Sequence, residues 1–335
     1  MSKKVLLTGA AGFIGNYTAR ELLKQGYEVT GVDNLNHYYD PQLKYYRLEQ
    51  LRKLDNFNFY KLDIENQEAL RVLFEIHKPD MVINLAARAG VGYSLENPHV
   101  YLSTNGAGTL NLLELMVEFD IEKMVLASTS SLYAGQKMPF SEKLPVNTPI
   151  SPYAASKKAA EVMCYTYHFL YDLDISVVRY FTVFGPAGRP DMSIFRFIKW
   201  IDEGKDLILR GDGSQSRDFT YVEDIARGTV RAMEEKTGYE IINLGGGRNP
   251  RSLNEMIAFI EKTLGKKAKI KREPMPKEDM MSTWADIKKA HSLLGWKPEV
   301  SFEEGLSRTI EWHMKNRDWL KKVDPFLVEG SKKSG

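Results

Sequence analysis

The stretch from Lys4 to Gly15, Lys-Val-Leu-Leu-Thr-Gly-Ala-Ala-Gly-Phe-Ile-Gly, decides the fold. Its apolar start predicts a buried strand, and the glycines that follow open a helix. Glycine at Gly9, Gly12 and Gly15 permits a tight turn, a close approach of backbone to a pyrophosphate, and close packing of the helix on the strand. The unpaired N–H groups at the start of that helix favour a bound phosphate.

A second predicted strand, Tyr27 to Val32, ends in Asp33. This lies about 20 residues after the glycines, where a carboxylate accepts hydrogen bonds from the adenosine ribose hydroxyls of a dinucleotide. Its negative charge repels a phosphate on the same ribose. The sequence therefore predicts NAD rather than NADP as the cofactor.

Further strands alternate with helices along the chain, which predicts an α/β fold with a parallel, doubly wound Rossmann sheet. Asp63 and Ile64, at the end of the third strand, are predicted to frame the adenine. Leu85, Ala86 and Ala87 end the fourth, where small residues let the backbone lie against the cofactor. The later strands are predicted at Phe57 to Leu62, Met81 to Leu85, Lys123 to Ala127 and Ile241 to Leu244.

The composition excludes several classes of protein. With 46 basic and 44 acidic residues the net charge is +2, so nothing points to a nucleic-acid partner. No apolar run reaches the ~18 residues of a membrane span. The single cysteine, Cys164, rules out an internal disulfide and disfavours a cysteine-rich metal site, so we expect no metal and a cytoplasmic location. A length of 335 residues suggests one large α/β unit with an attached lobe.

Four consecutive hydroxyl residues, Ser128-Thr129-Ser130-Ser131, follow the strand that begins at Lys123. Open α/β sheets bind ligands at the carboxyl ends of their strands, so these side chains are placed for a site. A solvated loop gives the same pattern.

Tyr153 and Lys157 are four residues apart at the start of a predicted helix, so both side chains leave one face. A free tyrosine titrates near pH ~10, and a nearby positive charge lowers its pKa. Lys157, with a second cation such as an oxidised nicotinamide ring, would make Tyr153 a base near neutral pH. The same spacing also occurs by chance in many helices.

Together these motifs resemble the extended short-chain dehydrogenase/reductase family, and within it the nucleotide-sugar epimerases. The resemblance runs from Lys4 to about Trp312. It implies a nicotinamide on the Rossmann half and a UDP-sugar on a smaller mixed α/β carboxy-terminal lobe. By the family pattern Thr129 bonds the sugar 4-oxygen, Tyr153 is the base, and Lys157 contacts the ribose and lowers the pKa of that base. The further cofactor contacts that the resemblance implies are Phe13, Ile14, Asn34, Asn105 and Phe181.

Three places in the sequence distinguish members of the family. Its dehydratases carry Asp-Glu after the threonine and its decarboxylases usually a glutamate in the second position, whereas this chain has Ser130 and Ser131. The stretch from Arg179 to Met192 is similar to that of UDP-glucuronate 4-epimerases, and Thr182 stands where galactose-type epimerases have asparagine. The resemblance therefore implies interconversion of UDP-glucuronate and UDP-galacturonate.

The chemistry of that substrate indicates a role for the hydroxyl groups after the predicted strand and for that of Thr182. Oxidation of glucuronate at its 4-position makes a β-keto acid, which loses carbon dioxide when its carboxylate stands perpendicular to the ketone. We expect Thr129, Ser130, Ser131 and Thr182 to hold the carboxylate out of that alignment. For the rest of the substrate, Arg189 and Arg217 are expected at the diphosphate and Asp279 at the uridine ribose.

The sequence departs from the subgroup at Arg88 and Gly92, where glutamine and arginine are expected. Arg88 would put a positive charge near the nicotinamide pocket. Three alternatives therefore stay open: a 4-epimerase of UDP-glucose or UDP-N-acetylglucosamine, a UDP-glucuronate decarboxylase, and a non-catalytic nucleotide-binding regulator.

The predicted organisation has two domains. Residues 1–182 and 222–247 form the NAD-binding Rossmann domain, residues 183–221 and 248–325 form the nucleotide-sugar-binding lobe, and residues 326–335 form a disordered tail. From the family resemblance, helices that start near Asn105 and Tyr153 are expected to pair between the subunits of a homodimer.

Overall fold

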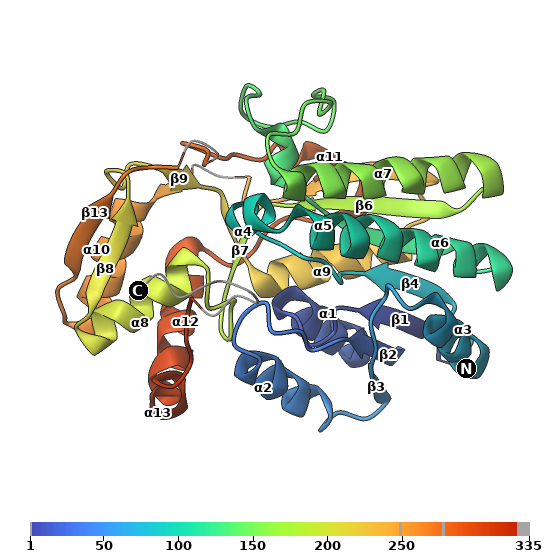
Figure 1. Ribbon diagram of the computed structural model, residues 1–335, viewed down its shortest axis with the longest axis horizontal. Coiled ribbons are helices and arrows are strands. Elements are labelled where there is room, and N and C mark those ends of the chain that lie inside the picture. Colours follow the sequence, from blue (N-terminus) through green and yellow to red (C-terminus); the bar gives the residue numbers. More distant parts are fainter. Residues whose placement is uncertain (1, 248–249, 277–278, 327–335) are drawn as a thin grey trace.

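A computed structural model of the protein describes residues 2–247, 250–276 and 279–326. Within them, seven strands form one sheet in the order β11-β6-β5-β4-β1-β2-β3 (Figure 1). Every neighbouring pair is parallel. This doubly wound order confirms the predicted Rossmann fold. The strands are β1 (Lys4–Thr8), β2 (Glu28–Asp33), β3 (Phe57–Lys61), β4 (Met81–Asn84), β5 (Lys123–Thr129), β6 (Asp174–Tyr180) and β11 (Tyr239–Leu244).

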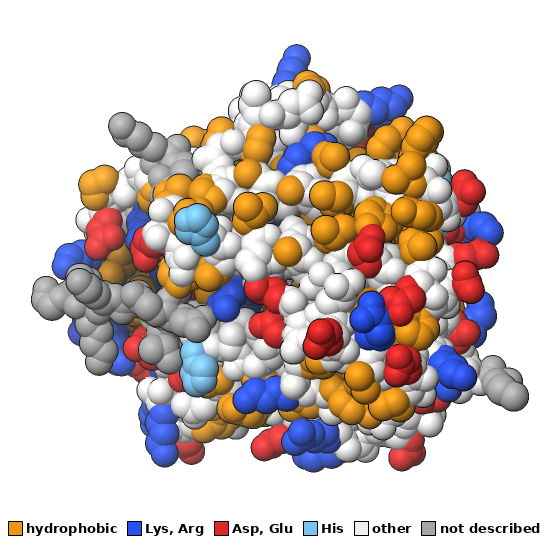
Figure 2. Space-filling model, turned by 45° about the vertical axis from the view of Figure 1, so that its right-hand side comes forward, with side chains coloured by type: hydrophobic (Ala, Val, Ile, Leu, Met, Phe, Trp, Pro, Cys, Tyr) orange, Lys and Arg blue, Asp and Glu red, His pale blue; other side chains and the backbone are white. Residues whose placement is uncertain are grey.

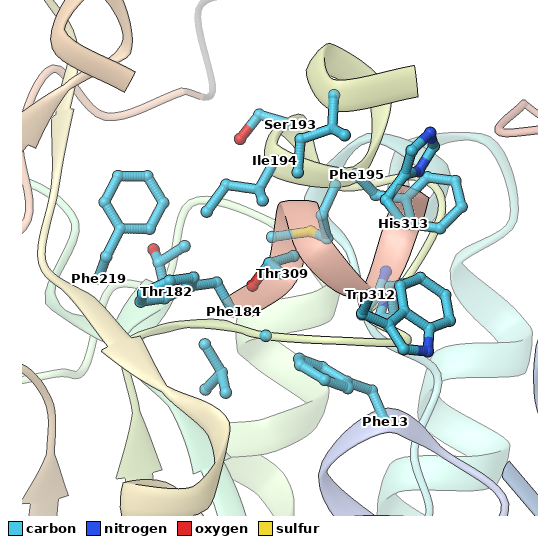
Figure 3. A pocket seen from close by; sticks show the side chains of 16 residues that line it. Phe13, Thr182, Phe184, Ser193, Ile194, Phe195, Phe219, Thr309, Trp312 and His313 are labelled. Carbon is cyan, nitrogen blue, oxygen red and sulfur yellow. The ribbon is translucent and has the colours of Figure 1, made fainter. Parts of the chain in front are cut away.

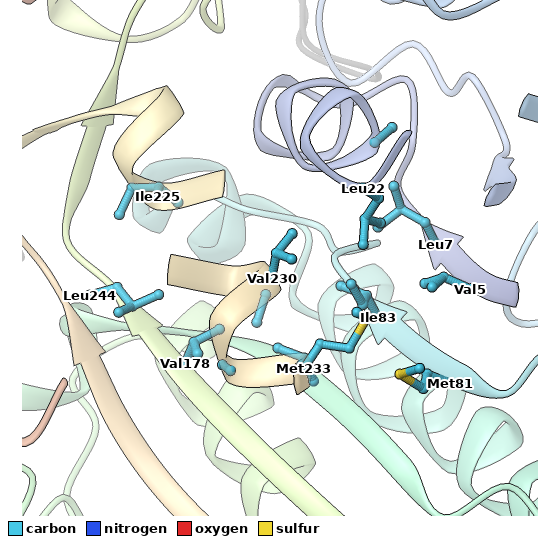
Figure 4. Close-up of a cluster of buried hydrophobic side chains, with 14 of the residues drawn as sticks. Val5, Leu7, Leu22, Met81, Ile83, Val178, Ile225, Val230, Met233 and Leu244 are labelled. Atoms are coloured by element: carbon cyan, nitrogen blue, oxygen red, sulfur yellow. The ribbon is translucent and has the colours of Figure 1, made fainter. Parts of the chain in front are cut away.

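Helices cover both faces of the sheet. Side chains alternate along a strand, so Val5 and Leu7 of β1 point to one face and Leu6 to the other. The first face packs against α1 (Phe13–Lys24), α9 (Val222–Glu234) and α11 (Lys288–Leu294), and Figure 4 shows part of this cluster. The second face packs against α3 (Gln67–His77), α6 (Gly108–Glu118) and α7 (Pro152–Tyr171).

A smaller lobe lies beyond the carboxyl edge of the sheet (Figure 1). Its apolar core includes Phe197, Ile201, Leu207, Ile257 and Leu306. Its helices are α8 (Ser193–Glu203), α10 (Leu253–Leu264) and α12 (Phe302–Lys315). Its strands pair as β7 (Thr182–Phe184) with β10 (Phe219–Tyr221), β8 (Asp206–Arg210) with β13 (Lys269–Glu273), and β9 (Ser216–Arg217) with β12 (Arg251–Ser252).

The predicted domain limits stay a prediction. Ala290 and Leu294 of α11, in a segment assigned to the lobe, are buried in the core of the large sheet. Of the predicted tail, residues 327–335 lie outside the described part of the chain, whereas the ring of Phe326 stacks on Trp200 at 5.6 Å. In the described residues, no helix has the length and apolar character that crossing a bilayer requires.

Two segments near the sheet edge differ from the sequence prediction. The helix predicted to begin at Asn105 starts as a π-helical segment, η1 (Leu102–Ala107), before α6. Such wide turns are uncommon and are frequent at functional sites. Strand β5 extends through Thr129, and the next residues form a 3₁₀ turn, η2 (Ser130–Tyr133). The remaining short helices are α2 (Gln42–Leu51), α4 (Val91–Glu96), α5 (Pro98–Tyr101) and α13 (Arg317–Leu320).

Candidate active site

A cleft of about 690 Å³ runs along the carboxyl edge of the sheet and is closed on the far side by the lobe. It brings together nearly all of the residues singled out from the sequence. Those that line it are Gly9, Gly12, Phe13, Ile14, Gly15, Asp33, Asn34, Asp63, Ile64, Leu85, Ala86, Ala87, Thr129, Ser130, Ser131, Tyr153, Lys157, Phe181, Thr182, Arg189, Arg217 and Asp279. Their individual roles stay predictions.

The glycine-rich turn fits a dinucleotide phosphate. Gly9 has a φ of +69°, and a Cβ built on Gly15 would lie 2.0 Å from the carbonyl oxygen of Gly9. No side chain caps the start of α1 at Gly12, so its first N–H groups remain for a ligand. A Cβ on Gly9 or Gly12 would likewise lie within 2.9 Å of backbone atoms, so the turn keeps this shape only with glycine at these positions.

Asp33, the last residue of β2, stabilises this turn through hydrogen bonds. Its carboxylate accepts hydrogen bonds from the backbone N–H of Ala11 at 3.2 Å and of Leu35 at 2.8 Å. The ammonium of Lys44 lies 3.9 Å away. Because the carboxylate is fixed by backbone donors and lines the cleft, it fits the ribose contact that the sequence predicts.

Tyr153 lies in the first turn of α7, where Ser151 caps the helix by accepting from Ala154 N at 3.2 Å. The side chain of Thr129, the last residue of β5, interacts with the hydroxyl of Tyr153 and lowers its pKa. The Thr129 hydroxyl also accepts from Ser131 N at 3.1 Å. A phenol and a hydroxyl thus meet at one point of the cleft.

Arg189 is a cation near Tyr153 that the sequence did not predict to act on it. Burial raises the pKa of Tyr153, and the Thr129 hydrogen bond and the charge of Arg189 lower it. Lys157 donates instead to the carbonyl oxygen of Ala127 at 3.0 Å, and burial lowers the pKa of Lys157 to about 8. Without a cofactor, the charge that lowers the pKa of Tyr153 is that of Arg189, and the expectation that Lys157 also lowers it stays a prediction.

Arg189 is held over the cleft by three neighbours. It pairs with Asp191 through Nε to Oδ1 at 3.0 Å and Nη2 to Oδ2 at 2.6 Å. It also donates to the carbonyl oxygen of Ala89 at 3.2 Å, and its guanidinium lies 5.5 Å from the ring centre of Tyr38. Farther along the cleft, Arg217 donates to Asp279 at 2.6 Å.

A family model described as GDP-mannose 4,6 dehydratase matches residues 6–309. The chain belongs to this family of extended short-chain dehydrogenase/reductases.

Known relatives are similar over almost the whole chain of this dehydrogenase/reductase. It is 60% identical over 318 residues to a UDP-glucuronate 4-epimerase of Thermodesulfobacterium geofontis, covering 95% of this chain and 98% of that one. A UDP-glucuronic acid 4-epimerase of Bacillus cereus, crystallised with UDP-glucuronic acid and NAD, superposes with a TM-score of 0.88 at 38% identity, covering 93% and 99%. A UDP-glucose 4-epimerase of Thermotoga maritima with UDP-glucose gives 0.86 at 32%, covering 94% and 100%.

Two residues of this dehydrogenase/reductase that the sequence singled out are not among those that line the cleft. Asn105, predicted as a cofactor contact, does not line the cleft. Its side-chain oxygen accepts from the backbone N–H of Arg88 at 2.8 Å, and its side-chain nitrogen donates to the carbonyl oxygen of Arg88 at 3.0 Å. The same nitrogen donates to the Ser156 hydroxyl at 2.9 Å. The Arg88 side chain is also absent from the cleft lining, whereas Gly92 is part of it. The π-helical turn carries Asn105 behind the cleft wall, where it fixes the loop after β4.

Sequence reasoning also missed several lining residues. Tyr38, Arg196, Arg210, Pro325 and Phe326 reach the cleft from four separate segments. Arg196 sits in the amphipathic helix α8, where an arginine normally marks the solvated face. Docking of the lobe turns it inward, and burial lowers its pKa.

A second cavity lies between the Rossmann half and the lobe (Figure 3). Phe13 faces it from α1, Ile194 and Phe195 from α8, and Thr309 and Trp312 from α12. Its volume is about 30 Å³, enough for one water but not for a sugar nucleotide. The cleft at the carboxyl edge of the sheet, which gathers the residues singled out from the sequence, is the candidate active site. In the described residues, no group of three or more histidine, cysteine or acidic side chains is arranged to hold a metal ion.

Proposed function

We propose that this protein is an NAD-dependent 4-epimerase that interconverts UDP-glucuronate and UDP-galacturonate. The observation that carries the proposal is the pairing of the Tyr153 and Thr129 hydroxyls beside Ser130, Ser131 and Thr182 in one cleft. The 60% identity to a protein named UDP-glucuronate 4-epimerase supports it. The family model bears the name of a dehydratase, but no carboxylate follows Thr129 here to eliminate water.

NAD would be held by the glycine-rich turn, with Asp33 at its adenosine ribose and Tyr153 and Lys157 at its nicotinamide half. When bound, it supplies the acceptor and later the donor of the hydride at the sugar 4-position. The protein does not need to supply redox chemistry of its own. Its side chains position the sugar and move one proton.

Tyr153 is the group that takes that proton. It accepts the hydrogen of the sugar 4-hydroxyl while Thr129 bonds the same oxygen, and it returns the proton once the hydride has come back to the other face. The positive charge of Arg189 favours the deprotonated phenol, because it lowers the pKa of Tyr153. A further cation beside the phenol, as in an oxidised nicotinamide ring, acts in the same direction.

The hydroxyl groups explain how the intermediate keeps its carboxylate. Ser130 and Ser131 begin the turn η2 directly after β5, and Thr182 begins β7, so two segments bring these hydroxyl groups to the lining of the cleft. Hydrogen bonds to a charged group contribute about 1.5–3 kcal/mol each. Three such donors hold the carboxylate away from the perpendicular geometry in which carbon dioxide leaves.

Arginines supply the diphosphate site. Arg189 and Arg217, which the sequence predicts at the diphosphate, line the cleft together with Arg196 and Arg210. Planar guanidinium groups bind phosphate oxygens in pairs. Asp279, which accepts a hydrogen bond from Arg217, would contact the uridine ribose.

The test is to incubate the purified protein with UDP-glucuronate, UDP-glucose and UDP-N-acetylglucosamine separately and to identify the products by NMR. We expect UDP-galacturonate from the first and no net change in the redox state of NAD. Release of carbon dioxide with a pentose nucleotide would instead assign a decarboxylase. Conversion of only the neutral sugars would assign the activity of the Thermotoga maritima relative, and no conversion would favour a nucleotide-binding regulator.

We also propose a cytoplasmic homodimer. Figure 2 shows hydrophobic side chains gathered over the upper part of one face of the molecule, where α7 lies. Val162, Tyr165, Phe169, Leu170 and Tyr171 of α7 are each about half exposed or more. A patch of this kind fits a subunit interface better than open solvent. The one cysteine, Cys164, is free and buried, which suits a reducing compartment.

A further inference from the structure

Arg47, in helix α2, is only 1% exposed, yet its side chain carries a full charge. Its guanidinium donates to the carbonyl oxygen of Ala187 from both Nε, at 2.9 Å, and Nη2, at 2.7 Å. Nη2 also donates to Gly188 O at 3.1 Å, and Nη1 donates to Ala11 O at 3.2 Å and to the Tyr39 hydroxyl at 2.6 Å. All of its partners are neutral oxygens.

No carboxylate of the described residues lies within ion-pair distance of this guanidinium. A buried charge is costly unless hydrogen bonds satisfy it, and structural arginines in a protein interior usually have an acidic partner. Buried Arg179 of the same chain has one, Glu161. Arg47 therefore does something other than form a salt bridge.

The segments that Arg47 connects indicate what its role is. Ala11 belongs to the glycine-rich turn, which is the predicted binding site of the dinucleotide phosphates. Ala187 and Gly188 immediately precede Arg189, and Ala187 has a φ of +53°, a conformation that costs free energy in any residue with a side chain. Through Arg47, the turn on the Rossmann half holds the strained loop that carries Arg189 over the cleft.

We propose that Arg47 is a positioning residue that sets Arg189 for the diphosphate of the nucleotide sugar and couples that site to the dinucleotide turn. The inference rests on the proposed function, since it assumes a nucleoside-diphosphate ligand at Arg189. Asn16 strengthens the unit by donating from Nδ2 to the carbonyl oxygen of Arg47 at 2.8 Å. Lysine cannot replace the arginine, because one ammonium cannot reach oxygens of several segments in a planar fork.

The experiment compares Arg47→Lys, Arg189→Lys, the double variant and the exposed control Arg52→Lys, all as holoenzymes. Calorimetry gives the Kd of UDP, and NMR assays give KM and kcat for UDP-glucuronate. We expect Arg47→Lys to raise both Kd and KM about tenfold with kcat nearly unchanged, while Arg52→Lys matches the wild type. Since Arg47 acts through Arg189, adding Arg47→Lys to Arg189→Lys should weaken UDP binding by less than about twofold more.

Independent, multiplying effects of the two substitutions would overturn the proposal, because they would mean that Arg47 acts on the fold alone. If Arg47→Lys does not fold, Tyr39→Phe removes one bond to the guanidinium and leaves the carbonyl bonds, and it should weaken UDP binding in the same direction by a smaller factor. Unchanged UDP affinity in the folded variant would also overturn the proposal, as would a wild-type protein that does not bind UDP. A protein that binds UDP but leaves UDP-glucuronate unchanged would contradict the proposed function, while the UDP affinities would still test Arg47.

Discussion

Glu161 and Arg179 form a bidentate ion pair in the interior. Arg179 Nε donates to Glu161 Oε1 at 2.8 Å, and Arg179 Nη2 donates to Glu161 Oε2 at 2.7 Å. Ser128, in β5, donates to the same carboxylate at 2.6 Å. Glu161 lies one turn after Lys157 on α7, and Arg179 lies on β6. The pair therefore ties the helix that carries Tyr153 to the two strands beneath it.

Glu161→Gln should lower the free energy of unfolding by about 3–5 kcal/mol, because it leaves the Arg179 charge buried without its counter-ion. Urea denaturation measures the change. The matched control is Glu118→Gln: Glu118 makes an equally two-pronged but exposed pair with Arg71, and its loss should cost less than about 1 kcal/mol. Equal losses in the two variants would mean that burial does not set the strength of the Glu161 pair.

Tyr153→Phe should lower kcat for epimerisation by about 10²–10⁴-fold, since it removes only the hydroxyl that takes the proton. NAD content, read from the absorbance of protein denatured after gel filtration, should stay the same. Tyr165→Phe, on an exposed part of the same helix, is the control and should keep full activity. A Tyr153→Phe protein with wild-type activity would rule out Tyr153 as the base.

Arg189→Gln should move the rising limb of the pH profile of kcat/KM to higher pH. Arg189 lowers the pKa of Tyr153, so its removal raises that pKa and a smaller fraction of the phenol is deprotonated at neutral pH. KM should also rise by about tenfold or more through the lost phosphate contact. Arg217→Gln is the control, because it removes another cleft arginine that does not act on Tyr153: KM should rise while the limb stays in place.

Gly15→Ala should abolish NAD retention, because the added Cβ would lie 2.0 Å from the carbonyl oxygen of Gly9 and force the turn open. Gly106→Ala adds the same methyl group where the nearest atom, a side-chain carbon of Leu102, is 3.4 Å away. NAD titration monitored by calorimetry compares the two. Normal NAD affinity in Gly15→Ala would contradict the close packing of the turn.

Phe169→Glu should convert the proposed dimer into a monomer, since Phe169 is 74% exposed on the apolar face of α7. Sedimentation velocity gives the mass of the particle. Ile76→Glu, at a 62% exposed position on α3, is the control and should leave the mass unchanged. A wild-type protein that sediments as a monomer would remove the dimer from the proposal.

The local features of the fold followed from short stretches of sequence. Lys4–Thr8 is a strand because of its apolar run, and the turn after it needs glycine at Gly15 whatever the rest of the chain does. Ser151 before an apolar helix is a cap for the same kind of reason. In each case the contacts that decide the conformation lie within a few residues of one another.

The sequence by itself thus determined the alternating strands and helices, the glycine turn and the shared face of Tyr153 and Lys157. Only the tertiary structure decided that the charge of Arg189 also acts on Tyr153, that Asn105 bonds the loop after β4, and that Arg47 holds the loop before Arg189. These outcomes depend on contacts between residues that are far apart in the chain, such as the 140 positions between Arg47 and Ala187. Such contacts depend on how distant segments pack against one another, and the local periodicity of the sequence does not specify that packing.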